Sequence, residues 1–222
     1  MKKILLDQCH STQEILKEHV QSLDSFFPIL VSTKKQTNGY GRRGNQWIFT
    51  EKSIAMSCTI KLNRTPSLTP LEISCLVLSF FKDIHQKDIA LKWPNDLLSL
   101  SGIKMGGIIL STFKDFALLG IGINLKSSPK IDSYPTASLN ISTNTDNIST
   151  ELYEYILSNR ISPDETIKRW NQSCIHLDQR VSFNHKNYLF KGIDKLGLAL
   201  LLNEEEKIIK VSSGEVSLIF PH

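Results

Sequence analysis

Apolar and polar residues alternate along parts of this chain with the period of a β-strand. From Ile54 to Ile60 every second residue is apolar, with small or polar residues between, which predicts a half-buried strand over Ser53–Leu62. Shorter apolar runs predict further strands at Ile4–Leu6, Pro28–Thr33, Ile89–Trp93, Leu97–Leu100, Met105–Phe113 and Phe116–Leu125. Turn signals separate the last three runs, so we expect them to form successive antiparallel strands.

Four segments are predicted to be helical. Three of them begin with capping-box spacing, in which a Ser or Thr accepts a backbone bond and a Glu three residues later reaches back. The expected helices are Thr12–His19, Thr69–His85, Thr150–Asn159 and Ser162–His176. The second is apolar around most of its circumference and should lie deep against the sheet.

The pattern of apolar and polar residues changes twice after the predicted sheet. Lys126–Thr150 is polar and has no periodicity, which is typical of a functional or mobile loop. Short strands follow at Val181–Phe183, Tyr188–Ile193, Leu198–Leu202, Lys207–Val211 and Glu215–Phe220. We therefore predict an α+β fold: residues 1–177 with a mostly antiparallel mixed sheet and helices packed on it, and residues 178–222 as a small all-β domain.

Composition and charge exclude several classes of protein. The net charge of +4 is small for 222 residues, so no broad basic face is available for duplex DNA. The longest apolar stretches, Ile73–Phe81 and Phe116–Leu125, are too short and interrupted to span a bilayer. The apolar run after Met1 stops too early for a signal peptide. The four cysteines lack metal-ligand spacing. These features predict a cytoplasmic protein with reduced, buried cysteines and no protein-bound metal.

The stretch Gln36–Trp47 contains three glycines, two adjacent arginines and a tryptophan. Lys34 and Lys35 precede it, and no acidic residue occurs between Phe27 and Phe49. Exposed backbone N–H groups and guanidinium forks both suit phosphate or carboxylate oxygens, so we interpret the stretch as an anion site. The alternative is a solvated turn with two surface arginines.

Other glycine-rich sites fit this stretch poorly. Gly39, Gly41 and Gly44 match the dinucleotide fingerprint, but the chain continues through Trp47 into a strand rather than a helix. The position for a ribose-binding acid holds Asn63 and Arg64 instead. The sequence also lacks the H-R-D and D-F-G segments of kinases, a P-loop, and a Gly-x-Ser-x-Gly nucleophile elbow.

Two further segments contain candidate binding residues. One is Lys92–Asp96, followed by Lys104 and the pair Gly106-Gly107; the other is Gly120–Asn124. Glycines at these positions would let a ligand lie against bare backbone. The alternative is close strand packing or a bulge.

In order along the chain, these segments resemble the pattern of the biotin protein ligases, which adenylate biotin and attach it to a carrier lysine. The matching segments are Ser11-Thr12, Gln36–Trp47, Lys92–Leu97, Lys104–Leu110 and Gly120–Asn124, and residues 192–197 and 214–218 resemble the small C-terminal domain of the family. The resemblance spans nearly the whole chain. It implies a class II synthetase-like ligase core with an SH3-like C-terminal domain, in the short form without an N-terminal DNA-binding domain.

The resemblance also implies a reaction and its partners. We expect biotin and ATP, with Mg²⁺, to form biotinyl-5′-AMP, and biotin then to pass to a lysine of a biotin carboxyl carrier protein such as an acetyl-CoA carboxylase subunit. We expect a monomer or homodimer that binds neither DNA nor membranes. The alternatives are a lipoate or octanoate ligase, disfavoured by the pattern Gly39–Trp47, and a non-catalytic biotin- or nucleotide-binding module.

The resemblance assigns expected roles to individual residues. Arg42 and Lys104 should lie at the carboxyl–phosphate junction, and Asp96 either orients or deprotonates the acceptor lysine or only caps its own turn. The expected biotin-binding residues are Ser11, Thr12, Gln13, Gln36, Gly39, Tyr40, Gly41, Arg42, Lys104, Gly107 and Ile108. The expected adenylate-binding residues are Arg42, Arg43, Trp47, Asn95, Lys104 and Asn124.

Three places depart from the family pattern, of which the pair Met105-Gly106 only replaces other small or apolar pairs. Tyr40 stands where bacterial members often carry Arg, and Gln13 replaces a common Asn. We also expect the glycine-rich stretch and Lys126–Thr150 to be mobile without ligand and to close around the adenylate, which would keep water from the anhydride.

Overall fold

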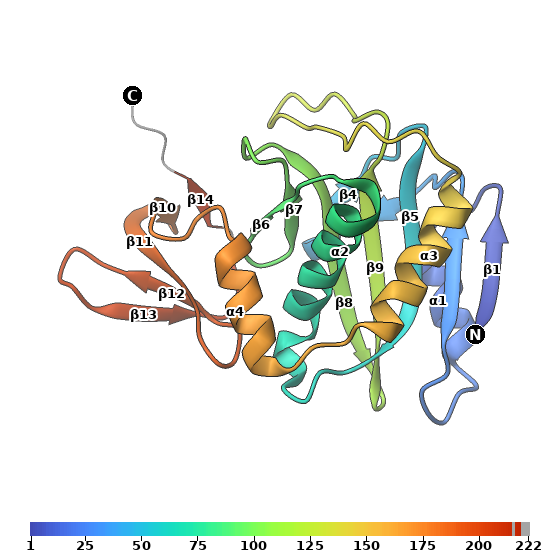
Figure 1. Ribbon diagram of the computed structural model, residues 1–222, viewed down its shortest axis with the longest axis horizontal. Helices are drawn as coiled ribbons and strands as arrows, with labels where there is room; N and C mark the ends of the chain where they lie inside the picture. The colour runs from blue at the N-terminus through green and yellow to red at the C-terminus, as the bar shows by residue number, and fades with distance from the viewer. Residues whose placement is uncertain (215, 219–222) are drawn as a thin grey trace.

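A seven-stranded sheet forms the centre of the larger part of the molecule (Figure 1). The computed structural model describes residues 1–214 and 216–218. The strands are β1 Lys2–Leu6, β2 Ile29–Thr33, β5 Ser53–Lys61, β6 Ala90–Lys92, β7 Asp96–Leu98, β8 Lys104–Phe113 and β9 Phe116–Asn124. They lie in the order β1-β2-β5-β9-β8-β7-β6. Only the β1–β2 pair is parallel among these neighbours, which confirms the predicted α+β fold with a mostly antiparallel mixed sheet.

Helices cover both faces of this sheet. They are α1 Thr12–Val20, α2 Thr69–His85, α3 Thr145–Ser158 and α4 Pro163–Ser173. Figure 1 shows α2 and α3 on one face and α1 on the other. Strand β2 contributes side chains to both faces of the sheet. Leu30 belongs to the buried cluster under α2 and α3, whereas Ile29 and Val31 belong to the buried cluster under α1. No helix among the described residues is long and apolar enough to cross a membrane.

Strand β5 differs from its prediction as a half-buried strand. Ile54 and the alternating apolar residues after it pack into the α2–α3 cluster. The intervening residues, such as Ala55 and Ser57, are buried too, because α1 and a cavity cover the second face. The alternation therefore marks two buried faces of different chemistry, one apolar and one small or polar.

Only one of the three predicted capping boxes has its side-chain cap. Ser162 Oγ accepts a hydrogen bond from the backbone N–H of Glu165 at 3.2 Å, at the start of α4. Ser11 and Thr69 make no such bond, so these two caps are wrong. The Thr69 hydroxyl instead donates to the carbonyl of Pro66.

Glu72, the acid of the second predicted box, has a tertiary role instead. Its side chain is fully buried, and its two oxygens accept from Arg160 Nε at 2.6 Å and Nη2 at 2.7 Å. Asn63 Nδ2 and the backbone N–H of Ile161 donate to the same carboxylate at 2.8 and 3.0 Å. This network ties α2 to the connection between α3 and α4.

The predicted long loop is shorter than expected. Helix α3 begins at Thr145 rather than at Thr150, and the Asn144 side chain caps it by accepting from two backbone N–H groups. Backbone bonds from Leu139 and Ile141 attach the end of the loop to the end of β9. Sequence periodicity missed the first turn of α3, since that turn is polar and its start depends on a cap.

A second, five-stranded antiparallel sheet follows α4. Its strands are β10 Arg180–Phe183, β11 Lys186–Ile193, β12 Ala199–Leu202, β13 Ile208–Val211 and β14 Ser217–Leu218, in the order β13-β12-β11-β10-β14. The predicted strand Glu215–Phe220 lies partly outside the described residues, at 215 and from 219 onward. One buried cluster continues from α4 into this sheet, where Trp170 lies beside Phe190. The domain division at residue 177 stays a prediction.

Three of the four cysteines are buried, as predicted, and Cys9 is half-buried. Burial raises the pKa of the Cys75 and Cys174 thiols to about 12. Thiols with such raised pKa values are mostly protonated at neutral pH and therefore unreactive.

Candidate functional site

A cavity of about 740 Å³ lies where the glycine-rich stretch, the start of α1 and the β6–β7 turn meet strands β5, β8 and β9. Thirteen of the predicted site residues line it: Ser11, Thr12, Gln13, Gln36, Tyr40, Gly41, Arg42, Arg43, Trp47, Asn95, Asp96, Lys104 and Gly107. Gly39, Ile108 and Asn124 lie outside the lining. The fold thus brings together segments that are distant in sequence.

The glycine-rich stretch forms a small hairpin. Strand β3 Gly39–Tyr40 pairs antiparallel with β4 Gln46–Trp47, and a 3-10 turn at Arg42–Gly44 joins them. Arg43 and Gly44 have positive φ angles of 57° and 76°. Such a left-handed turn favours glycine. No α-helix starts here, which agrees with rejecting the dinucleotide fingerprint.

Two strand glycines serve different purposes. A Cβ atom on Gly122 would lie 2.7 Å from Trp47 Cε2, so the indole rests on bare backbone of β9 and forms a wall of the cavity. A Cβ on Gly106 would lie 2.6 Å from the carbonyl oxygen of Gly122. Gly106 is therefore explained by close strand packing, whereas its neighbour Gly107 lines the cavity.

One end of the cavity is polar and already hydrogen-bonded. Gln36 Oε1 accepts from the backbone N–H of Thr12 at 2.9 Å and from its hydroxyl at 3.2 Å. The Thr12 and Ser57 hydroxyl oxygens lie 2.9 Å apart. A Cβ on Gly39 would meet the Gln36 amide at 2.1 Å, so glycine there makes room for this side chain. Buried Gln13 donates to a backbone carbonyl, and its Oε1 has no partner among the described residues.

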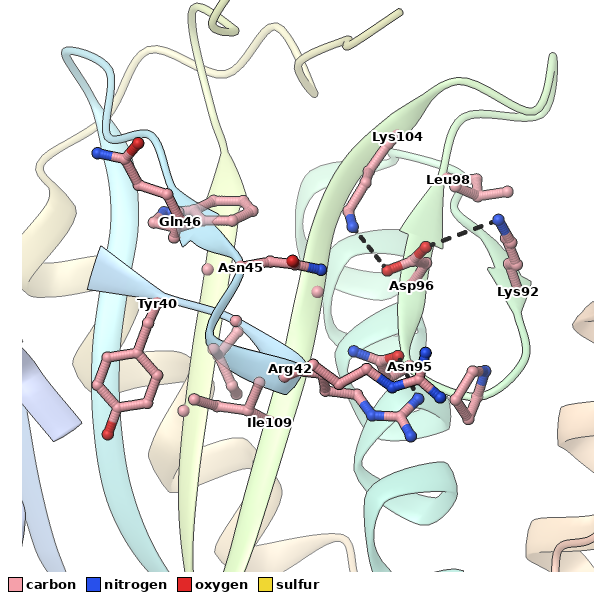
Figure 2. A pocket seen from close by; sticks show the side chains of 18 of the residues that line it. Tyr40, Arg42, Asn45, Gln46, Lys92, Asn95, Asp96, Leu98, Lys104 and Ile109 are labelled. Carbon is pink, nitrogen blue, oxygen red and sulfur yellow. Dashed lines mark hydrogen bonds and ion pairs between the residues drawn. The ribbon is translucent and has the colours of Figure 1, made fainter. Parts of the chain in front are cut away.

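Asp96 is the centre of a charged cluster at the other end. Its Oδ1 lies 2.9 Å from Lys104 Nζ, and its Oδ2 lies 4.0 Å from Lys92 Nζ (Figure 2). Among the described lining residues, Asp96 is the only carboxylate. The positive side chains there include Arg42 and Arg43 as well as the two lysines, so this end of the cavity suits an anion.

Arg42 is held in place by Asn95. Its Nη1 donates to Asn95 Oδ1 at 3.2 Å, while Asn95 Nδ2 donates to the Ile108 carbonyl at 2.9 Å. The Ile108 N–H donates in turn to the Asn95 carbonyl. Both backbone polar groups of Ile108 are therefore bonded to Asn95, and its side chain is buried, so the predicted backbone contact from Ile108 to a ligand has no free group here. Burial, followed by the charge of Arg43, lowers the pKa of Arg42 below its ordinary value.

Asn124 supports a loop rather than the cavity wall. Its Nδ2 donates to the Ala137 carbonyl at 3.0 Å, and the Ala137 N–H donates to the Lys104 carbonyl at 2.8 Å. The same loop brings the Tyr134 ring to 5.9 Å from Lys104 Nζ. Tyr134 lines the cavity. The aperiodic sequence of the loop contained no signal that would have identified it.

The C-terminal sheet contributes to the site as well. Trp93 donates from Nε1 to the Gly197 carbonyl at 3.1 Å, which joins the β6–β7 turn to this sheet. His176, Gly214 and Ser217 line the cavity, and sequence reasoning assigned none of them a role. Gly214 and Ser217 belong to the segment that resembled the family's C-terminal domain, whereas His176 lies before this sheet and outside the matching segments. Only the packing of the two sheets brings all three to the cavity.

The buried position of His176 leads us to expect that the stability of the folded protein depends on pH. His176 is 1% exposed, and burial, reinforced by Lys92 and opposed by Asp96, lowers its pKa from 6.5 to about 4. Between these values the unfolded chain binds a proton that the folded protein does not, so stability falls as the pH drops through this window. We expect His176 to account for about 2–3 kcal/mol of the stability lost between pH 7 and pH 4.5.

Urea denaturation at both pH values measures this loss. His176→Gln should lose less stability than the wild type over the same interval, and the exposed His185→Gln should behave like the wild type. Equal losses in His176→Gln and the wild type would contradict the prediction.

Comparison with known sequences gives a family and several relatives. The sequence profile of the Biotin/lipoate A/B protein ligase family matches residues 5–127. The Biotin--[acetyl-CoA-carboxylase] ligase of Mycobacterium tuberculosis is 28% identical over 122 residues, which are 51% of this chain and 46% of that one. Biotin--protein ligase 2 of Arabidopsis thaliana is 32% identical over 117 residues, 47% of this chain and 34% of that one. The match covers less than half of each relative.

Comparison with solved structures gives the same fold over nearly the whole chain. The biotin protein ligase of Aquifex aeolicus in complex with biotin and ATP has a TM-score of 0.80 at 24% identity, covering 98% of both chains. A mutant of the same enzyme in complex with biotin has a TM-score of 0.79 at 25% identity, covering 99% of this chain and 98% of that one. The Helicobacter pylori biotin acetyl coenzyme A carboxylase synthetase with bound biotinylated ATP has a TM-score of 0.74 at 22% identity, covering 94% and 99%.

Proposed function

The chain belongs to the Biotin/lipoate A/B protein ligase family, and we propose that it is a biotin protein ligase. It activates biotin with ATP to biotinyl-5′-AMP and then transfers biotin to a lysine of a biotin carboxyl carrier protein. One observation carries the proposal. A single cavity joins a polar, hydrogen-bonded end at Thr12 and Gln36 to a cationic end at Arg42 and Lys104. The polar end suits the neutral ring of biotin, and the cationic end suits the reaction between its carboxylate and ATP.

The first step brings two anions together. A carboxylate oxygen of biotin attacks the α-phosphorus of ATP, and the bond to pyrophosphate breaks as pyrophosphate leaves with the electron pair. Arg42 and Lys104 stabilise the negative charge at this junction, and Arg43 contacts phosphate oxygens. Mg²⁺ bound to ATP would neutralise phosphate charge during this step, and Asp96, the only carboxylate among the described lining residues, is the acidic side chain of the lining that could help to hold it.

The second step needs a neutral lysine amine. The amine nitrogen attacks the acyl carbon of the mixed anhydride, an amide bond forms, and AMP leaves. Asp96, the one carboxylate among the described lining residues, accepts a proton from the amine or orients the amine. Its charged neighbours are Lys104, 2.9 Å away, and Lys92, 4.0 Å away.

Asp96→Asn should slow the transfer of biotin from preformed biotinyl-adenylate by about 10²-fold, because a general base contributes on this scale. Single-turnover transfer to a carrier domain measures the effect. Asp115→Asn, at the exposed β8–β9 turn, is the matched control and should transfer at the wild-type rate. Unchanged transfer with collapsed adenylation would place Asp96 in the first step instead.

Biotin-dependent exchange between ATP and labelled pyrophosphate tests the proposed function. We expect exchange with biotin and none above background with lipoate or octanoate. Exchange only with lipoate or octanoate would favour the other branch of the family. Biotin or nucleotide binding without any exchange, by folded protein, would favour a non-catalytic binding module.

Three further predictions accompany this function. The acceptor is a carrier protein rather than DNA or a membrane, the protein is a monomer or homodimer, and it acts in the cytoplasm. Size-exclusion chromatography with light scattering, without and with biotinyl-adenylate, measures the oligomeric state.

A further inference from the structure

Three side chains join the β3–β4 hairpin to α1. The Tyr40 hydroxyl donates to Glu14 Oε1 at 2.6 Å. Lys17 Nζ lies 2.8 Å from the same carboxylate oxygen and 3.1 Å from the Tyr40 hydroxyl. We call these three residues the Tyr40 cluster. Glu14 and Lys17 lie one turn apart on α1, so both reach the same point on the hairpin.

The Tyr40 cluster lies across the hairpin from the charged end of the cavity. Figure 2 shows the Tyr40 ring directed away from Arg42 and Asn95. The hairpin is therefore attached on two sides, through Arg42 to Asn95 and through Tyr40 to Glu14. Glu14 and Lys17 do not line the cavity, so they have no direct contact to offer a ligand there.

The hairpin needs such attachments. It has two residue pairs, Gly39 with Trp47 and Tyr40 with Gln46, and it is not part of either larger sheet. A two-stranded hairpin of this length has little stability of its own. The glycines in and around it add conformational freedom that the folded state must restrict. Tertiary contacts therefore decide where its turn, and Arg42 in that turn, come to lie.

Within the Tyr40 cluster the phenol contact should contribute most. Glu14 and Lys17 have side chains that are 47% and 45% exposed, and exposed ion pairs contribute little. The Tyr40 hydroxyl is half-buried and bonds a charged acceptor, which makes a stronger hydrogen bond than a neutral one. The hydrogen bonds that Lys17 and Tyr40 donate to Glu14 lower the pKa of Glu14, so its carboxylate is charged at neutral pH.

We propose that Glu14 and Lys17 are positioning residues that act through the Tyr40 hydroxyl to hold the β3–β4 hairpin, and with it Arg42, over the cavity. The catalytic consequence rests on the proposed function, whereas the position of the hairpin does not. Tyr40 thereby links α1 to the hairpin that contains Arg42.

Limited proteolysis with trypsin tests the position of the hairpin without any activity. Trypsin cleaves after Arg42, which is half-buried, and Arg43, which is exposed. The backbone around both must open locally before it fits the protease, so a hairpin released from α1 should be cut faster. Tyr40→Phe and Glu14→Gln should be cleaved there about fivefold faster than the wild type. The matched control is Tyr155→Phe, which removes a hydroxyl bonded to Asp83 between two other helices and should be cleaved at the wild-type rate.

Pyrophosphate exchange tests the catalytic consequence. We expect kcat for biotin-dependent exchange to fall about fivefold in Tyr40→Phe and in Glu14→Gln. The double variant should lose no more than the larger single loss, because both changes act on the same contact. Independent, multiplicative losses would overturn the proposal, as would wild-type cleavage in both single variants. Faster cleavage together with a wild-type protein that shows no exchange would leave the positioning role intact and contradict the proposed function.

Discussion

Replacing Arg42 with alanine is expected to lower the rate of biotin-dependent pyrophosphate exchange by about 10²- to 10³-fold. The guanidinium is half-buried and is oriented by Asn95, near a second cationic group at Lys104. A charge held in this way needs no reorganisation when negative charge develops on the reacting carboxylate and phosphate. Water around the truncated side chain would replace it poorly, since the solvent must reorient first.

Two variants sharpen this test. Arg42→Lys keeps the charge but loses the planar fork, so its loss should be intermediate. Arg64→Ala removes an exposed arginine outside the cavity lining and should exchange at the wild-type rate. A loss of less than tenfold in Arg42→Ala would mean that the first step does not depend on this guanidinium.

The largest expected loss of stability comes from Glu72. Glu72→Ala should lower the free energy of unfolding by about 3–5 kcal/mol, because it leaves Arg160 unpaired and removes an acceptor from Asn63 and from the N–H of Ile161. Urea denaturation at neutral pH, followed by circular dichroism, measures the change.

Glu165→Ala is the matched control for this loss. It removes another Glu–Arg pair, with Arg169, but one that is partly exposed on the surface of α4, so its loss should stay below about 1 kcal/mol. Glu72→Gln keeps the shape and one acceptor oxygen, and it remains measurable if the alanine variant fails to fold. Equal losses at Glu72 and Glu165 would contradict the prediction.

Several features were predictable because they depend on neighbouring residues alone. Apolar runs and alternation located the seven strands of the large sheet but not the short strands β3 and β4, and Ser162 was correctly identified as a cap. The glycine-rich stretch was expected to be a loop between strands that forms an anion site, because its charge and its backbone freedom follow directly from the residue types in the stretch. The structure places Arg42 and Lys104 on one cavity with the polar end at Gln36.

Other features depended on contacts between distant segments, which periodicity does not encode. Glu14 and Glu72 have the spacing of capping residues, yet Glu14 bonds Lys17 and Tyr40, and Glu72 bonds Arg160. A charged donor at close range competes better for a carboxylate than a helix N-terminus does. The same holds for Gly122, whose missing side chain makes room for Trp47, and for His176, which reaches the cavity only through the packing of two sheets. Sequence order thus decided the local elements and the chemistry available, while tertiary packing decided which of those groups meet.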